Sequence, residues 1–428
     1  MIEELKEQNI ALYYENLEVL HNACLNENQI RMLKTYNDYL YNELDTDKVM
    51  QGVLSTEKNY ILNGWFIASE EKKLEKVING VPGYVKIKIE EPLKTDNPPS
   101  LVRNNKVIAP YESITNLYSP PSKNDLDPNI FVALFYFIFF GIMIGDIGYG
   151  IIMFVAAALF LLFYKPKKGM KDLVMIICMG GVSAIIWGVF FGSFFGLEGA
   201  GGSPTFLPSV IDPINDALTF LIFTLGVGVV HIVFGLVLKF ANLVRQKRFI
   251  DAICDSLFRI TLFVGLILVA VSMFLEVESL SMPGIIVAVA SAGLIFLTAG
   301  RNGKGIFGKL AGGFGGLYSL VNYVSDILSY ARLFGLGLVG AVIAMVANII
   351  AGMLFGIPII GIPIGILVAL VFHAFNLALG LLSAYVHNAR LQFVEFFGKF
   401  YEGGGKEFTP LGNNTKHIKI KSSLREEK

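Results

Sequence analysis

The fold is decided by the stretch GFGGLYSLVNYVSDILSYARLFGLGLVGAVIAMVANIIAGMLF, residues 313–355. A turn with two prolines, within residues 357–363, separates it from a second apolar stretch at residues 364–397. A transmembrane helix needs roughly 17–25 residues, so both stretches are longer than a perpendicular crossing requires. Excess apolar length is accommodated by tilting, by kinking or by projection from the bilayer. The sequence therefore predicts a long tilted helical hairpin.

The composition separates an acidic segment from a basic, apolar one. The 428 residues are 54% hydrophobic and 16% charged, with a mean hydropathy of +0.59. Residues 1–128 carry 14 Lys and Arg against 20 Asp and Glu, whereas residues 129–428 carry 21 against 15. This composition excludes a disordered chain, a secreted disulfide scaffold and a simple soluble enzyme.

Residues 1–128 are predicted to form a cytoplasmic arm with a small α/β lobe. Residues 1–50 contain no glycine or proline, and leucines recur among charges, which predicts an amphipathic helix or coiled-coil arm. For the lobe we expect a strand over 58–67, a helix over 70–79 and a strand over 84–90. Residues 92–128, rich in proline and asparagine, are expected to run extended into a membrane domain.

Residues 129–398 are predicted to form eight transmembrane helices, so the fold class is that of a mainly α membrane protein. Two helices are expected within 129–164, and the others over 173–197, 217–238, 260–275, 279–300 and the two arms of the hairpin. Basic residues lie in alternate connections and in the tail, at 165–172, 239–259, 301–309 and 399–428. The connections between these contain no Lys or Arg. The positive-inside rule then predicts that both termini lie in the cytoplasm.

Two arginines lie within the predicted hairpin. Arg332 lies 28 residues before Ile360 and Arg390 lies 30 after it, so an antiparallel hairpin brings them to nearly one level. An arginine deep in a membrane helix costs at least ~2.5–3.5 kcal/mol on insertion scales, so it faces protein or water and has a task. The alternative for Arg332 is an internal ion pair with Asp326, although a separation of six residues is a poor pairing on a helix. For Arg390, snorkelling to the inner interface is an alternative.

Small polar residues recur at helical spacing beside both arginines. They are Ser325 and Ser329 for Arg332, and Ser383 and His387 for Arg390. This seam predicts a wet groove, with helix packing by small polar residues as the alternative. Asp146 is interpreted either as a surface charge or as part of an outer water cavity. His231 and His373 are expected to be packed, hydrogen-bonded histidines rather than proton relays.

Several catalytic signatures are missing from the sequence. It contains no G-x-x-x-x-G-K-[ST] loop, so we expect no ATP binding through a Walker motif. The three cysteines, Cys24, Cys178 and Cys254, are too scattered to suggest a metal site or a disulfide framework. No cofactor and no nucleic-acid partner is predicted.

Three ordered motifs carry a resemblance to a known family. They are FGIMIGDIGYG at 140–150, SDILSYARLF at 325–334, and SAYVHNARLQFVEF at 383–396 followed by KFYEG at 399–403. They resemble the motifs of subunit a of the rotary V/A-type ATPases, called subunit I in prokaryotes. NGWF at 63–66 and PPSLVRNN at 98–105 resemble the soluble domain of that subunit.

The resemblance implies a stator subunit beside a ring of small membrane subunits, each with a carrier carboxylate. Arg332 would face that carboxylate and Arg390 would support the interface, between two aqueous half-channels that couple H⁺ or Na⁺ translocation to rotation and to ATP hydrolysis or synthesis elsewhere. The half-channel candidates are Asp146, Asn322, Ser325, Asp326, Ser329, His387 and Glu395. The implied partners are the ring, peripheral-stalk, central-stalk-associated and ATP-hydrolysing subunits, in a prokaryotic cell membrane.

The sequence departs from the family pattern in two places. Family members have a longer soluble domain, so this chain is expected to be a shortened version whose anchoring of a peripheral stalk stays open. Eukaryotic members carry a glutamate where this chain has Gly380, so Asn376 or Asn322 is expected to supply polarity instead. The alternative functions are a secondary transporter of an anionic substrate, which predicts an internal repeat, and a structural anchor, which leaves Arg332 unexplained.

Overall fold

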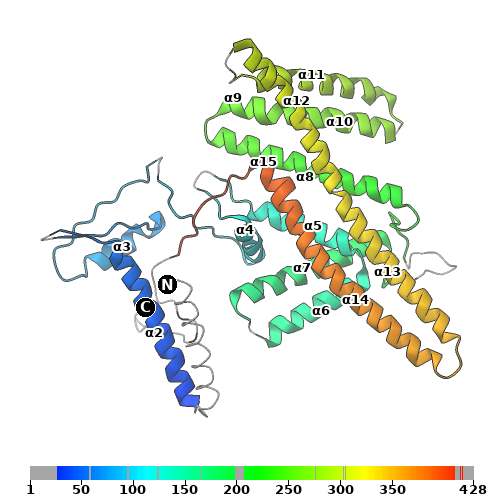
Figure 1. The fold of residues 1–428 in the computed structure, drawn as a ribbon, viewed down its shortest axis with the longest axis horizontal. Helices are drawn as coiled ribbons and strands as arrows, with labels where there is room; N and C mark the ends of the chain where they lie inside the picture. Colours follow the sequence, from blue (N-terminus) through cyan, green and yellow to red (C-terminus); the bar gives the residue numbers. More distant parts are fainter. Residues whose placement is uncertain are drawn as a thin grey trace, which may run out of the picture. The chain divides into compact units, whose positions relative to one another are not determined.

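The computed structural model describes residues 27–56, 59–93, 96–122, 125–164, 166–197, 207–274, 276–301, 303, 305–409, 415 and 417. The chain divides into two compact units, one made of residues 1–91 with 408–428 and the other of Pro92–Glu407. Helices dominate the described residues, which confirms the predicted mainly α class (Figure 1).

The described part of the first unit contains one long helix and a short hairpin. Its elements are α2 (Glu27–Gln51), β1 (Leu54–Ser55), β2 (Tyr60–Ile61), η1 (Ala68–Glu70) and α3 (Glu71–Ile78). The helix predicted within 1–50 is confirmed from Glu27 onward, and residues 1–26 lie outside the described residues. Several apolar side chains of α2, such as Met32 and Tyr36, are exposed, and a coiled coil stays a prediction.

The predicted strand over residues 84–90 is wrong. These residues form neither helix nor strand, and β1 pairs only with β2 among the described strands. The alternating side chains Val85, Ile87 and Ile89 are exposed, and Tyr84 is 96% exposed. Alternation predicts a strand only where one face can be buried and the backbone paired, and neither condition is met here.

The connection over residues 92–128 is only partly extended. It contains η2 (Ala109–Tyr111) and α4 (Glu112–Tyr118). Pro110 stands at the start of η2, where its missing N–H is tolerated, and Tyr111 and Ile114 are buried in the core. Burial of these two side chains overrides the extended tendency of the flanking prolines.

Three helices open the apolar part of the second unit. They are α5 (Asn129–Ile144), α6 (Ile147–Phe163) and α7 (Lys168–Phe191). The turn between α5 and α6 falls where it was predicted, because Gly145 ends α5 with a positive φ of 46°. Asp146 then caps α6 by accepting a hydrogen bond from the Tyr149 N–H at 2.9 Å.

The middle of the chain forms a second group of helices. They are α8 (Ala217–Arg245), α9 (Phe249–Ala252), the π-helix η3 (Ile253–Leu257), α10 (Phe258–Phe274), η4 (Glu278–Leu280) and α11 (Ser281–Ala299). Arg301, after α11, donates to the Asp255 carboxylate at 2.9 and 3.1 Å and to Asp251 at 2.5 Å. These ion pairs fasten the end of α11 to the start of the preceding helical segment.

The predicted C-terminal hairpin is confirmed. It consists of α12 (Gly305–Ser329), α13 (Ala331–Phe355), α14 (Gly361–Arg390), the π-helix η5 (Leu391–Phe397) and α15 (Gly398–Phe400). Its turn is at residues 356–360, and Pro363 is tolerated in the first turn of α14. Figure 1 shows the two arms running antiparallel, in yellow to red, and obliquely to α7 and α8.

Among the described residues, six helical segments are long and apolar enough to cross a bilayer. They are Lys168–Phe191, Ala217–Arg245, Phe249–Phe274, Glu278–Ala299, Gly305–Phe355 and Gly361–Phe400. α5 and α6 are equally apolar but have 16 and 17 residues, at or below the usual lower limit of roughly 17. The structure thus shows six candidate crossings, and the eight predicted spans stay a prediction for α5 and α6.

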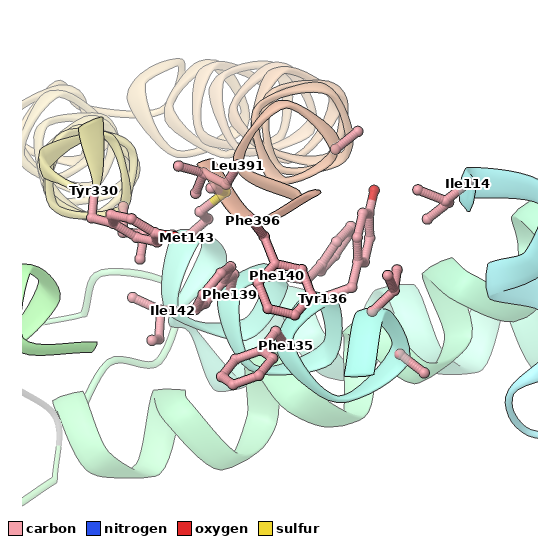
Figure 2. Packing of buried hydrophobic residues seen from close by; sticks show 14 of the residues in the cluster. Ile114, Phe135, Tyr136, Phe139, Phe140, Ile142, Met143, Tyr330, Leu391 and Phe396 are labelled. Carbon is pink, nitrogen blue, oxygen red and sulfur yellow. The ribbon is translucent and has the colours of Figure 1, made fainter. Parts of the chain in front are cut away.

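α5 lies at the centre of the buried core. Figure 2 shows its residues Phe135, Tyr136, Phe139 and Phe140 packed beneath the hairpin, which contributes Tyr330, Leu391 and Phe396. A helix that is apolar on all sides is expected where protein surrounds it, which explains the composition of α5. This core supports the hairpin at the level of the two arginines.

Candidate functional site

The register of the hairpin confirms that Arg332 and Arg390 lie at one level. Asn348 and His373, which lie 12 residues before and 13 after Ile360, are joined by a hydrogen bond of 3.0 Å between Oδ1 and Nε2. The two arms therefore pair at nearly equal distances from the turn, as the arginine spacing predicts.

Arg332 follows a break in its helix. Tyr330 separates α12 from α13, and Arg332 is half-buried just beyond it. One terminal nitrogen of its guanidinium, Nη1, is buried and has no hydrogen-bond partner among the described residues. Because arginine stays charged in proteins, this is a permanent positive charge with a free donor.

The facing arm of the hairpin changes its winding directly after Arg390. The π-helix η5 begins at Leu391 and buries Gln392 and Glu395 completely or nearly so, at 0% and 2% exposure. The Glu395 carboxylate interacts electrostatically with Arg332 and lies beside Ser329, whose hydroxyl donates to the Ser325 carbonyl at 3.1 Å. Single-turn π-helices occur frequently at functional sites.

Buried polar atoms without partners gather at this level. Within the described part of the chain they include Glu395 Oε2, both amide atoms of Gln392 and His387 Nδ1. His387 also lies close enough to both arginines to interact with them electrostatically. An unpaired buried polar group costs about 1–3 kcal/mol, so such a cluster requires water or an external partner. We name Ser329, Arg332, His387, Arg390 and Glu395 the arginine seam.

A cavity of about 140 Å³ lies between the seam and the turn of the hairpin. Its lining residues come from α5, α6, α13 and α14: Met143, Ile144, Tyr149, Leu336, Val339, Gly340, Ile343, Asn376, Leu377, Leu379, Gly380 and Ser383. A side chain at Gly380 would meet open space, since no atom lies within 4 Å of its Cβ position. The cavity is large enough for several waters.

A hydrogen-bonded network closes the turn side of this cavity. The Asn376 amide donates to the Tyr149 hydroxyl at 3.1 Å, and that hydroxyl lies 2.7 Å from His373 Nδ1. The other ring nitrogen of His373 contacts Asn348, whose amide donates to the Phe195 carbonyl at 2.8 Å. The network links four polar side chains without a carboxylate.

Comparison with known proteins shows which family the chain resembles. Residues 2–198 match the V-type ATPase 116kDa subunit family. The A-type ATP synthase subunit I of Pyrococcus horikoshii is 33% identical over 391 residues, which cover 88% of this chain and 57% of that protein. The same subunit of Methanocaldococcus jannaschii is 30% identical over 396 residues, which cover 85% of this chain and 56% of that protein. The chain is thus similar to the V-type ATPase 116kDa subunit family at residues 2–198, and to archaeal ATP synthase subunit I over most of its length. It spans a little over half the length of these two relatives.

A bacterial member of the family is also similar. The V-type ATP synthase subunit I of Borreliella burgdorferi is 26% identical over 415 residues, which cover 92% of this chain and 65% of that protein. The resemblance carried by the three motifs is thereby confirmed, and family members in archaea and bacteria align over most of the chain.

The structure brings some candidate residues together and separates others. Ser329, His387 and Glu395 lie with the arginines in the seam. Asn322 and Ser325 lie on the exposed face of α12. The remaining candidates have structural partners and are treated next.

Asp326 does not pair with Arg332. Its carboxylate accepts a hydrogen bond from the Lys399 ammonium, which also lies 4.3 Å above the Tyr323 ring. Among the described residues no carboxylate lies within 4.0 Å of Arg332. The alternative of an internal Asp326–Arg332 ion pair is therefore wrong, because Asp326 pairs with Lys399 of α15.

Asp146 is not a surface charge. It is 3% exposed, and its second oxygen accepts a hydrogen bond from the Ser193 hydroxyl at 2.7 Å. The carboxylate thus fixes both α6 and the segment after α7. The sequence signal for this role was available, since Asp directly before an apolar helical stretch is a typical N-cap.

Replacing Asp146 with alanine is expected to destabilise the chain by about 0.5–2 kcal/mol, the usual cost of losing an N-cap. Asp146→Asn keeps an acceptor for the Tyr149 N–H and should retain most of the stability. Thermal unfolding of the purified chain in detergent measures both variants. Equal stability of wild type and Asp146→Ala would show that the cap contributes nothing.

His231 and His373 are hydrogen-bonded and packed, as the sequence predicts. His373 belongs to the network beside the cavity, and His231 lies 2.7 Å from the Tyr330 hydroxyl. Sequence reasoning missed Gln392 and Tyr330 as members of the site. Gln392 left a signal, since it is an amide inside an apolar run two residues after Arg390.

Proposed function

We propose that this chain is the ion-translocating stator subunit of a V/A-type rotary ATPase. The observation that carries the proposal is the hairpin register, which brings Arg332 and Arg390 to one level beside buried polar atoms that lack partners. A second chain that supplies a carboxylate at this level would satisfy the guanidinium of Arg332. The partners are a ring of small membrane subunits, peripheral-stalk and central-stalk-associated subunits, and the ATP-hydrolysing subunits.

The chemistry follows from the cost of charge in lipid. A carboxylate that crosses lipid on a turning ring must be neutral, by protonation or by bound Na⁺, because a bare charge there is prohibitively unstable. Opposite Arg332 the ionised form is favoured, since a nearby opposite charge lowers a carboxyl pKa by about 1–3 units. The ring site therefore unloads its ion on reaching Arg332 and reloads after passing it.

Two offset aqueous paths turn this exchange into one-way transport. The cavity beside Asn376 and Ser383 is the half-channel on the side of the hairpin turn, and the seam with His387 and Glu395 leads to the opposite side. Arg332 stands between them and blocks a direct leak. The basic connections support a topology with the turn outside and both termini in the cytoplasm of a prokaryotic cell, in which α5 and α6 complete eight spans.

Thiol labelling tests the half-channel. In a chain with its native cysteines replaced by serine, Ser383→Cys in the cavity is compared with Leu382→Cys, its 59% exposed neighbour outside the lining. A hydrophilic maleimide should react about tenfold faster at Ser383→Cys in assembled complexes, because the reactive thiolate forms only where water reaches. Equal or faster reaction at Leu382→Cys would contradict an aqueous path here.

A further inference from the structure

A buried histidine–tyrosine pair lies at the level of Arg332 and takes no part in the ion path. His231 from α8 and Tyr330 at the α12–α13 break are both 0% exposed, and His231 Nδ1 lies 2.7 Å from the Tyr330 hydroxyl. The other ring nitrogen of His231, Nε2, is buried without a partner among the described residues. The imidazole is therefore held by a single hydrogen bond, and that bond goes to the helix break.

The break at Tyr330 is a tightened turn. The Tyr330 N–H donates to the Ile327 carbonyl at 3.0 Å, and the Leu333 N–H donates to the Tyr330 carbonyl at 2.9 Å. Both bonds span three residues, as in a 3₁₀-helix, where an α-helix would span four. This tighter winding rotates the side chains of α13 about the helix axis relative to those of α12. Arg332 is the second residue after Tyr330, so its direction depends on the winding at the break.

Close packing keeps the tyrosine ring in place. Gly228, one turn before His231 on α8, makes the room, because a Cβ there would lie 2.4 Å from the Tyr330 ring. Phe139 of α5 meets the rings of His231 and Tyr330 edge-on, at 4.9 and 5.9 Å between centroids. Three helices thus converge on the break.

The same histidine contacts the opposite arm of the hairpin. The Phe396 ring stacks on the imidazole of His231 at 4.2 Å between centroids and 20° between planes. Phe396 directly follows Glu395 in η5. The His231 side chain therefore contacts both the neighbour of Glu395 and Tyr330, the residue at the helix break before Arg332. The aromatic rings around His231 give it apolar surroundings, which favour a packing role over a role in proton transfer.

We infer that His231 is a positioning residue that sets the direction of Arg332 through the Tyr330 hydroxyl, and that of Glu395 through Phe396. The inference rests on the proposed function of Arg332. Without the hydrogen bond the tightened turn can relax toward α-helical winding, and Arg332 turns away from its place in the seam. A displacement of about 1 Å at a reacting group can lower a rate by about 100-fold.

The test compares two substitutions of His231, by asparagine and by glutamine, whose side-chain amides differ in reach. The side-chain amide of asparagine occupies the position of imidazole Nδ1, whereas that of glutamine reaches the position of Nε2. His231→Asn should therefore keep the bond to Tyr330 and pump ions at a rate within about threefold of wild type, whereas His231→Gln should lose at least tenfold. Tyr330→Phe keeps every ring contact, loses only the hydroxyl, and should behave like His231→Gln.

The readout is the rate of ATP-driven ion pumping by assembled complexes in vesicles. A merely structural role predicts the reverse order, because asparagine is smaller than glutamine and leaves the larger void. Equal or greater loss of pumping rate in His231→Asn, or a normal pumping rate in Tyr330→Phe, would overturn the inference. Arg332→Ala, measured in parallel, separates the two claims: if it pumps normally the proposed function fails, and if it is inactive while His231→Gln is normal, only the positioning role fails.

Discussion

Replacement of Arg332 by alanine is expected to abolish ATP-driven ion pumping while leaving the complex assembled. The guanidinium has a buried nitrogen without a partner and no carboxylate within 4.0 Å among the described residues, so its removal breaks no ion pair inside the chain. A carboxylate on the ring would lose the charge that lowers its pKa by about 1–3 units, and its ionised population would fall about 10- to 1000-fold. Unloading of the ion would then limit every step of rotation.

Arg332→Lys should be severely impaired as well. Lysine retains a charge but lacks the planar fork of guanidinium, and a buried lysine can deprotonate. Arg390→Ala is the matched control, because Arg390 lies at the same level but is exposed on its helix. We expect that variant to be milder. Pumping into vesicles, with assembly checked by subunit stoichiometry, measures all three, and normal pumping by assembled Arg332→Ala would return this arginine to a structural role.

Replacement of Gly150 by alanine is expected to destabilise the membrane domain more than any exposed glycine substitution. α6 and α7 touch backbone to backbone here, since a Cβ on Gly150 would lie 2.8 Å from the Gly181 carbonyl oxygen and from the Ile185 N–H. Neither neighbour is a flexible side chain, so the helices must separate. Overpacking of this kind costs typically about 1–3 kcal/mol.

Gly226→Ala provides the control for Gly150→Ala. Gly226 also lies inside a helix, α8, but its Cβ position has nothing within 4 Å. Alanine is favoured over glycine in a helix by up to about 1 kcal/mol, so this variant should be neutral or stabilised. Thermal unfolding in detergent should show a lower midpoint for Gly150→Ala only. A fall of equal size in both variants would mean that backbone contact between α6 and α7 is not what limits stability.

The hairpin could be predicted from the sequence because its evidence is local and cumulative. Two apolar stretches of excess length, joined by a turn with two prolines, predict an antiparallel helical hairpin. Counting residues from Ile360 then gives the pairing of the two arms, which the Asn348–His373 hydrogen bond confirms. Apolar length alone was a weaker guide for α5. Ten of its 16 residues are buried in the protein core, where helices as apolar as membrane spans also occur.

The details of the site could not be predicted in the same way. The break at Tyr330 and the π-helix after Arg390 contain neither proline nor glycine, and both arise where side chains of α5 and α8 pack against the hairpin. Likewise, the alternation at residues 84–90 predicted a strand although no described strand pairs with it. Local patterns indicate the periodicity of an element, whereas tertiary contacts decide whether it forms and where its winding changes.

A structure of the assembled complex tests the central proposal most directly. If Arg332 acts on a carrier carboxylate, the ring subunit nearest the hairpin should place a carboxylate within about 4–6 Å of the Arg332 guanidinium, the range over which an opposite charge shifts a carboxyl pKa. Arg390 should lie at the same level. An Arg332 that faces lipid, or that pairs with Glu395 while every ring carboxylate lies elsewhere, would contradict the proposal.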